Sequence, residues 1–122
     1  GKFPPAVESN GFTFTAAIGG TDENGKVVSR LSLEQSQKAL ENLQTVLGKN
    51  GLSMDDVLRC TVFITDIRDI IYVERAMEKL FKDVRPAFSI LQVQGLPGEQ
   101  KVAVEAIAIR RGSKEDIVDF MG

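Results

Sequence analysis

Two residue types that build many catalytic and metal centres are scarce in this sequence. Histidine is absent, and Cys60 is the only cysteine. Zinc and haem sites therefore lose their usual ligands, and neither a Ser-His-Asp triad nor a Cys-His pair can form. We expect no metal and no cofactor. A lone cysteine also excludes an internal disulfide and is typical of a reducing compartment.

Long apolar runs and a strong excess of one charge are missing as well. No stretch approaches the roughly 18 apolar residues that span a bilayer, so we expect no membrane association. The formal net charge is −2, which argues against nucleic acid as a partner. The N-terminal residues show no signal-peptide pattern. We expect a cytoplasmic protein, and a mitochondrial location stays open for a chain whose leader has been removed.

What is present fits one globular domain that spans residues 1–122, because 43% of the residues are hydrophobic and 26% are charged. Residues 12–18 alternate aromatic and threonine side chains, as strands do. The turn signal Asp22-Glu23-Asn24-Gly25 is followed by Lys26-Val27-Val28, which is typical of a short returning strand. The sequence therefore predicts a hairpin over residues 12–28.

The next segments alternate between helix and strand. Leucines recur every seven residues at Leu33, Leu40 and Leu47, which predicts an amphipathic helix of about four turns. Ser32 and Gln35 have the spacing of a capping box at its start, and Asn50-Gly51 is a typical helix end.

Strands are predicted at residues 57–65, 88–93 and 102–109, and a second helix after Asp66, with a helical turn in the tail at 113–120. The order β-β-α-β-α-β-β indicates an α+β fold, a mixed sheet with two helices on one face.

The last strand is apolar on both of its faces. Positions 102, 104, 106 and 108 are valine or alanine, and the alternate positions 103, 107 and 109 are alanine or isoleucine. A sheet with one face in water shows polar residues on every second position. Two helices cover only one face, so we expect copies of the chain to bury the other; its own tail is the alternative. Glu105 stands alone as a carboxylate in this strand.

Six stretches, spread over nearly the whole chain, match the pattern of a known family in the right order. They are Ala6-Val7, Gln37 to Leu43, Val57 to Asp66, Pro86-Ala87-Phe88-Ser89, Leu96-Pro97 and Val104 to Arg111. With these stretches the chain resembles the RidA/YjgF family, which is also called endoribonuclease L-PSP. The resemblance implies a chorismate-mutase-like fold, a homotrimer, and small-molecule ligands in clefts between subunits.

The resemblance implies an activity whose key residues this sequence lacks. Family deaminases hydrolyse enamines and imines, with an arginine that clamps the substrate carboxylate and a glutamate that orients water. Here the arginine position holds Phe88 and the glutamate position holds Ala103. A phenyl ring cannot bind a carboxylate as a guanidinium does. The backbone N–H of Ile90 remains, and Glu105 follows Ala103 on the same strand face, about 7 Å along.

The implied pocket is more apolar than that of a deaminase, because the family's S-G-Q motif becomes Thr15-Ala16-Ala17 and its N-terminal tyrosine becomes Phe3. Arg59 and Arg85 are the two candidates for a replacement clamp. The expected ligand pocket consists of Phe3, Thr15, Ala16, Ala17, Ile18, Arg59, Phe88, Ser89, Ile90 and Ala103.

Three functions fit this pattern. The first is a trimeric small-molecule binder or regulator without standard imine deaminase activity. The second is an enamine or imine hydrolase of the 2-iminobutanoate/2-iminopropanoate deaminase type that uses Glu105 as its base. The third, endoribonuclease activity, is the least supported, since RNA cleavage commonly uses histidine as general acid and base.

Overall fold

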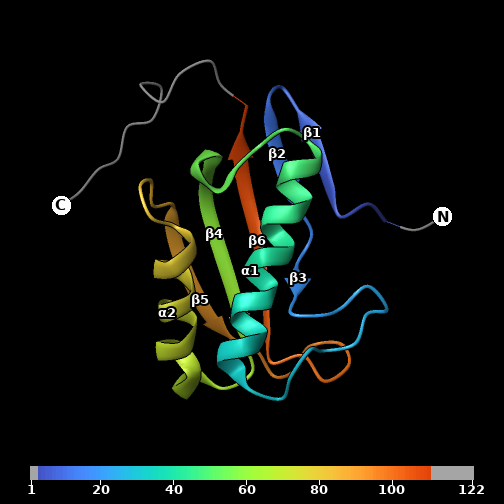
Figure 1. Ribbon diagram of the computed structural model, residues 1–122, viewed down its shortest axis with the longest axis vertical. Coiled ribbons are helices and arrows are strands. Elements are labelled where there is room, and N and C mark those ends of the chain that lie inside the picture. The colour runs from blue at the N-terminus through green and yellow to red at the C-terminus, as the bar shows by residue number, and fades with distance from the viewer. Residues whose placement is uncertain (1–2, 111–122) are drawn as a thin grey trace.

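The computed structural model describes residues 3–110, and the predicted turn at 113–120 lies outside them. Figure 1 shows one sheet with both long helices packed on the same face, so the predicted α+β architecture is confirmed. The elements are β1 (Ala6–Ser9), β2 (Phe12–Thr15), β3 (Ile18–Gly19), α1 (Ser32–Lys49), β4 (Val57–Ile64), α2 (Ile70–Leu80), β5 (Ala87–Gln92) and β6 (Val102–Ile109). Two short 3-10 helices, at Met54–Asp56 and Ile67–Asp69, precede β4 and α2.

The sheet is mixed, and its centre is the last strand. The strand order is β1-β2-β6-β4-β5, and β3 also pairs with β6. Within residues 3–110, β4 and β5 run parallel and the other strand pairs are antiparallel. The helix between β4 and β5 supplies the long connection that a parallel pair needs. β6 thus joins the N-terminal strands to the β4–β5 pair.

The N-terminal hairpin lies earlier in the chain than predicted. β1 pairs with β2 across Asn10 and Gly11, whose φ angles are 53° and 82°. Two successive positive φ angles are the mark of a tight hairpin turn that fits the strand twist. The predicted turn with Gly25 exists, but its flanks form only one isolated bridge, Thr21 to Val27. The hairpin predicted over residues 12–28 is therefore wrong.

Helix α1 ends where predicted, but its 18 residues make about five turns instead of four, and its start differs. Leu31 is its N-cap, and Ser32 and Gln35 do not form the predicted capping box. The Ser32 hydroxyl instead donates to the Asp69 carboxylate at 2.5 Å. The fully buried Gln35 side chain donates to the Ser29 carbonyl and accepts from the Lys101 N–H, both at 2.8 Å. Tertiary contacts thus replace the local cap.

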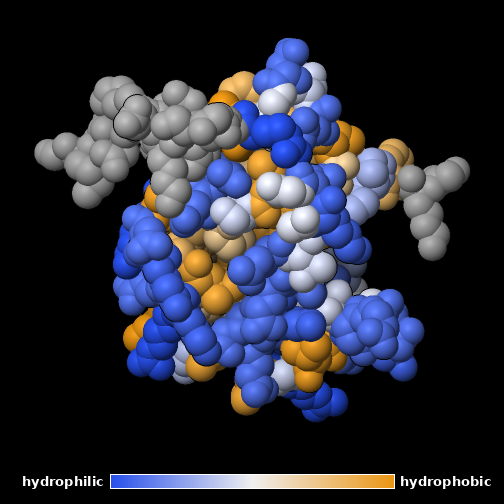
Figure 2. Space-filling model, turned by 45° about the horizontal axis from the view of Figure 1, so that its top comes forward, coloured by the Kyte–Doolittle hydropathy of each residue, from blue (hydrophilic) through white to orange (hydrophobic). Residues whose placement is uncertain are grey.

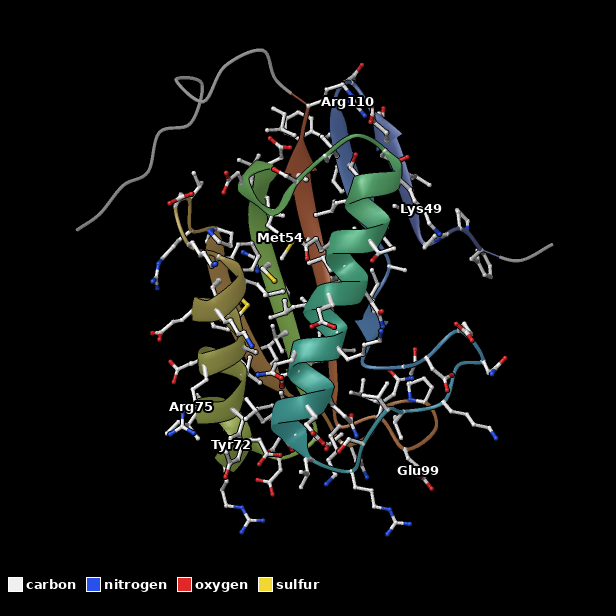
Figure 3. The ribbon with its side chains drawn as sticks, in the orientation of Figure 1. Lys49, Met54, Tyr72, Arg75, Glu99 and Arg110 are labelled. Atoms are coloured by element: carbon white, nitrogen blue, oxygen red, sulfur yellow. The ribbon has the colours of Figure 1, made fainter. Side chains whose placement is uncertain are left out.

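The core fills the space between the helices and the sheet. Figure 2 shows hydrophilic residues over much of the helix side, with hydrophobic residues gathered between the two helices. Met54, which is labelled in Figure 3, is one of the buried core residues. No helix in residues 3–110 is long and apolar enough to cross a membrane. The buried cluster includes Leu40, Leu43 and Leu47 of α1, Val73, Ala76 and Met77 of α2, and Val57, Cys60, Val62, Ile64, Val102, Val104, Ala106 and Ala108 of the sheet.

We expect Cys60 to be inert toward thiol reagents in the folded protein. Burial, and secondarily the charge of Glu105, raise the pKa of its thiol to about 12. At pH 8 the thiolate fraction is then about a thousandfold lower than for a free cysteine with a pKa of about 8.5. The measurement is the rate of reaction with a disulfide reagent, against the same protein in concentrated guanidinium chloride. A native rate within tenfold of the unfolded rate would contradict this.

The face of the sheet that points away from the helices is called the open face below. Val7, Phe12 and Phe14 of the N-terminal hairpin and Leu91 of β5 are 37–54% exposed. The strand pairing puts Phe12 opposite Ile109 and Phe14 opposite Ile107, and residues that pair across neighbouring strands share a face. The open face is therefore largely apolar in the single chain.

Candidate functional site

A hollow on the open face brings together several of the predicted site residues. Its volume is about 150 Å³, and β2, β4 and β6 supply its walls. We call it the open-face pocket. It is lined by Phe14, Thr15, Arg59, Thr61, Glu105, Ala106 and Ile107.

Register places the two charged residues of the open-face pocket diagonally across β4 and β6. Thr61 pairs with Glu105, and Arg59 pairs with Ile107. Diagonal neighbours lie about 7–8 Å apart. In residues 3–110 the ion pairs are Arg68–Asp66 and Arg110–Glu8, so Arg59 and Glu105 do not form a salt bridge with each other.

Thr61 adds a hydroxyl to the same wall. Thr61 is only 6% exposed, and a buried hydroxyl ordinarily has a hydrogen-bond partner. Among the described residues, no hydrogen bond is found for this hydroxyl, and its side chain lines the open-face pocket. A polar group that could bind a ligand therefore lies between the cation and the anion.

Thr15 holds the edge of the pocket where the N-terminal strands separate. Its hydroxyl accepts from the Ala106 N–H and donates to the Ala16 carbonyl, both at 2.9 Å. A side chain thus takes the place of a ladder bond between β2 and β6. Ala16 and Ala17 lie outside the strands and are exposed at this break, and Ile18 returns to pair with Val104 in β3.

Ala103 lies beside this break, and it carries no charge there. It pairs with Gly19 and is 3% exposed. A Cβ atom on Gly19 would lie 1.9 Å from Oε1 of Gln100, so the end of the Gln100 side chain occupies the space beside Gly19. Ala103 shares the open face with Glu105 because both have the same parity on β6.

Phe88, by contrast, lies on the helix-covered face. It pairs with the buried Cys60, whereas Ala103 pairs with Phe63 on the opposite side of the sheet. Phe88 lines a second, smaller hollow of about 90 Å³ with Met77, Phe81, Arg85 and Pro86. Arg85, one of the two candidate clamps, is therefore near Phe88 and away from the open-face pocket.

Ser89 and Ile90 belong to an edge strand. β5 pairs only with β4 in residues 3–110, and Val93 donates its N–H to the Ile64 carbonyl at 2.8 Å. N–H groups alternate between the two sides of a strand. Ser89 therefore points its N–H toward β4, and Ile90 points its N–H to the unpaired edge.

The predicted pocket is thus divided in a single chain. Thr15, Arg59 and Glu105 meet in the open-face pocket, while Phe88 and Ile90 lie two strands from β6. Phe3 is 95% exposed and precedes β1. The open-face pocket also has lining residues that the sequence analysis did not predict, namely Phe14, Thr61 and Ile107. The alternation of side chains along the strands could have indicated Thr61, since it shares the parity of Arg59.

Two carboxylates outside the open-face pocket, Glu8 and Asp66, pair with arginines. The side-chain hydrogen bond from Arg110 holds the pKa of Glu8 below its usual value, and Arg68 lowers that of Asp66 to about 2. Asp66 also caps the following turn by accepting from the Arg68 N–H. Across the described part of the chain, no group of three His, Cys, Asp or Glu residues could hold a metal ion.

The chain is similar to known proteins both in sequence and in fold. The family model for endoribonuclease L-PSP matches residues 1–110. A RutC family protein of Aquifex aeolicus is 34% identical over 90% of both chains. Reactive Intermediate Deaminase A of Arabidopsis thaliana is 30% identical over 88% of this chain, which spans 58% of that protein. The crystal structure of Escherichia coli TdcF with bound serine superposes with a TM-score of 0.84 at 29% identity, covering 91% and 90% of the two chains.

Proposed function

The chain belongs to the endoribonuclease L-PSP family of RidA/YjgF proteins, and from that premise we propose that it is an oligomeric small-molecule binder without standard imine deaminase activity. Its relatives include a reactive intermediate deaminase. This chain differs from such an enzyme at the expected reaction site, where it has Phe88 and Ala103.

The observation that carries the proposal is the position and chemistry of Phe88. This residue stands where the family resemblance places the carboxylate clamp, and it lines a hollow with Met77, Phe81, Arg85 and Pro86. Ala103, at the position of the water-orienting glutamate, is 3% exposed. Neither side chain can bind a carboxylate or move a proton. Two interactions that a deaminase needs in its transition state are missing.

A binding role is supported by the open-face pocket. It retains a cation, an anion and a hydroxyl in a hollow of about 150 Å³ with apolar walls. Such a mixture of apolar lining and a few polar groups is typical of small-molecule sites. A solved structure of the relative TdcF contains serine, so a site for a small metabolite is compatible with this fold.

Self-association completes the proposal. The apolar open face and the unpaired edge of β5 are surfaces that monomeric proteins usually cover. A second copy could bring the Ile90 N–H of one chain to the strand break at Ala16 of another, which would unite the two halves of the predicted pocket. We infer a homotrimer with ligand sites between copies, as the family resemblance implies.

We expect no acceleration of imine hydrolysis. The assay couples a pyridoxal-phosphate dehydratase, which releases 2-aminoacrylate or 2-aminocrotonate, to the detection of ammonia and 2-oxo acid. The rate with this protein should equal the spontaneous rate, because Phe88 cannot bind the substrate carboxylate and Ala103 cannot orient water. A deaminase of the same family serves as the positive control. Sedimentation of the same sample should show an oligomer, and a monomer would contradict the assembly.

An imine hydrolase that uses Glu105 is the alternative, and the placement of Glu105 beside Arg59 in one pocket favours it. If the assay shows turnover, Glu105→Ala should abolish it, whereas Ala103→Ser should not. Turnover that survives Glu105→Ala would contradict both functions. RNA cleavage is less supported, because histidine is absent and the net charge is −2.

A further inference from the structure

Three of the four asparagines in this chain precede a glycine, namely Asn10, Asn24 and Asn50. An asparagine in that position can react with its own backbone, because the amide nitrogen of the next residue can attack the side-chain carbonyl. Glycine has no side chain to obstruct that approach. All three asparagines are exposed. The sequence alone therefore does not separate them, and the hydrogen bonding of the attacking nitrogen must do so.

Hydrogen bonds hold the attacking nitrogen at two of the three places. The Gly25 N–H donates to the Asp22 carbonyl at 3.0 Å, and the Asp22 carboxylate accepts from two further N–H groups of the same turn. The Gly51 N–H donates to the Gly48 carbonyl at 3.0 Å, where α1 ends. Each of these nitrogens must break its hydrogen bond before it can turn toward the side chain, which costs free energy.

The pair Asn10-Gly11 differs from the other two pairs. In residues 3–110 neither the Gly11 N–H nor the Asn10 side chain has a hydrogen bond. Ser9 pairs with Phe12 across the turn, so Asn10 and Gly11 form the whole loop between β1 and β2. β1 is an edge strand of four residues, and a short edge element opens locally at low cost. Ring closure therefore meets the least resistance here.

The turn also lies apart from the face that the proposed oligomer buries. Figure 1 shows the β1–β2 turn at one end of the sheet, beyond the ends of the strands. The open face is formed by side chains along the strands. Assembly through that face leaves the tip of the hairpin in water.

We propose that Asn10 is a site of spontaneous deamidation through a cyclic imide with Gly11. The Gly11 nitrogen forms a bond to Cγ of Asn10, the bond from Cγ to Nδ2 breaks, and ammonia leaves with the proton of the Gly11 N–H. Water then opens the imide at either carbonyl. Opening at Cγ gives aspartate, and opening at the backbone carbonyl gives isoaspartate, whose main chain runs through Cβ and Cγ. This inference is independent of the proposed function.

Isoaspartate has a structural consequence, because it adds one atom to the main chain of a two-residue turn. The Arg110 N–H donates to the Gly11 carbonyl at 2.6 Å, and the Arg110 guanidinium donates to the Glu8 carboxylate at 3.0 Å. Figure 3 labels Arg110 at the same end of the molecule. Loop length sets the register of a hairpin, so the added atom displaces Gly11 from Arg110. Aspartate keeps the turn, because it tolerates a positive φ as asparagine does.

The first experiment measures the reaction at all three pairs in the same sample. The full chain is incubated at pH 8, and peptide mass spectrometry of timed digests gives the fraction of acid at Asn10, Asn24 and Asn50. Asn10 should convert about tenfold faster than either of the others. In concentrated urea the three rates should become similar, since each pair is then an open Asn-Gly. Equal native rates, or a faster rate at Asn24 or Asn50, would overturn the proposal.

The pH dependence tests the imide route. The attacking nitrogen must lose its proton, so conversion at Asn10 should be slower at pH 6 than at pH 8. Part of the product should be isoaspartate, which an isoaspartyl methyltransferase detects with labelled S-adenosylmethionine. A product that is aspartate alone would mean direct hydrolysis of the side-chain amide and would overturn the imide.

The structural consequence is tested against a variant of the same charge. Asn10→Asp carries the carboxylate without the added main-chain atom. Hydrogen exchange at the Arg110 amide should be several-fold faster in the isoaspartate form than in freshly prepared Asn10→Asp, and Asn10→Asp should match the parent. Equal exchange in the two acidic forms would overturn the displacement of Gly11 from Arg110.

Discussion

Replacing Gly20 with alanine is expected to lower the free energy of unfolding by about 3 kcal/mol. A Cβ atom on Gly20 would lie 2.3 Å from the Gln35 carbonyl oxygen and 2.8 Å from the Gln35 Cα. These are backbone atoms of α1, so they cannot rotate out of the way as the end of a side chain can. Either the helix or the end of β3 must move, and the packing of both depends on their close approach.

Urea unfolding of both variants measures this effect. Gly48→Ala is the matched control. It adds a methyl group to α1, the helix that Gly20 contacts, and this methyl group meets no atom within 4 Å. Alanine favours the helix over glycine by about 0.5–1 kcal/mol, so the control should be more stable than the parent. A Gly20→Ala variant within 1 kcal/mol of the parent would show that α1 and β3 can separate at little cost.

The second large effect is expected for Gln35→Leu, at about 2–3 kcal/mol of lost stability. Gln35 is fully buried, and its amide is bonded to the Ser29 carbonyl and the Lys101 N–H. Leucine has a similar size but leaves both backbone groups without that partner. The loss should exceed the gain from burying more apolar surface, because an unsatisfied buried polar group costs about 1–3 kcal/mol.

Gln44→Leu provides the control for this substitution. Gln44 is exposed on the same helix, and exposed substitutions usually change stability by less than about 0.5 kcal/mol. Equal unfolding midpoints for the two leucine variants would mean that the Gln35 hydrogen bonds add nothing to stability. Amide exchange at Lys101 gives an independent check, since its N–H should exchange faster in Gln35→Leu.

Local patterns predicted most of the helices and long strands. β6 has the predicted bounds, 102–109, because its run of valine, alanine and isoleucine fits no other element. β1 was missed because its four residues hold one β-branched side chain, Val7, and the Asp22–Gly25 turn signal was stronger. The cap of α1 was mispredicted because Ser32 and Gln35 bind distant residues, which no local pattern reveals.

Local patterns also predicted part of the candidate site. Side chains alternate between the two faces of a strand, so the sequence alone places Ala103 and Glu105 on the same face of β6. The face of Phe88, however, depends on how β5 is aligned with β4, and only the register, with Phe88 beside Cys60, settles it. The pairing of Thr61 with Glu105 likewise comes from strands that are 44 residues apart in the chain. Long-range register, which the sequence does not encode locally, decides which side chains meet.

The central place of β6 also has a consequence for how the protein is made. The ribosome releases β1 to β5 before residues 102–109, yet β2, β3 and β4 all pair with β6. Until β6 emerges, the β1–β2 pair and the β4–β5 pair have no strand between them. The apolar strands of the nascent chain therefore cannot yet form one sheet. Folding must therefore follow synthesis of the final strand, as expected for sheets built on distant pairings, and chaperones would act on the chain during that interval.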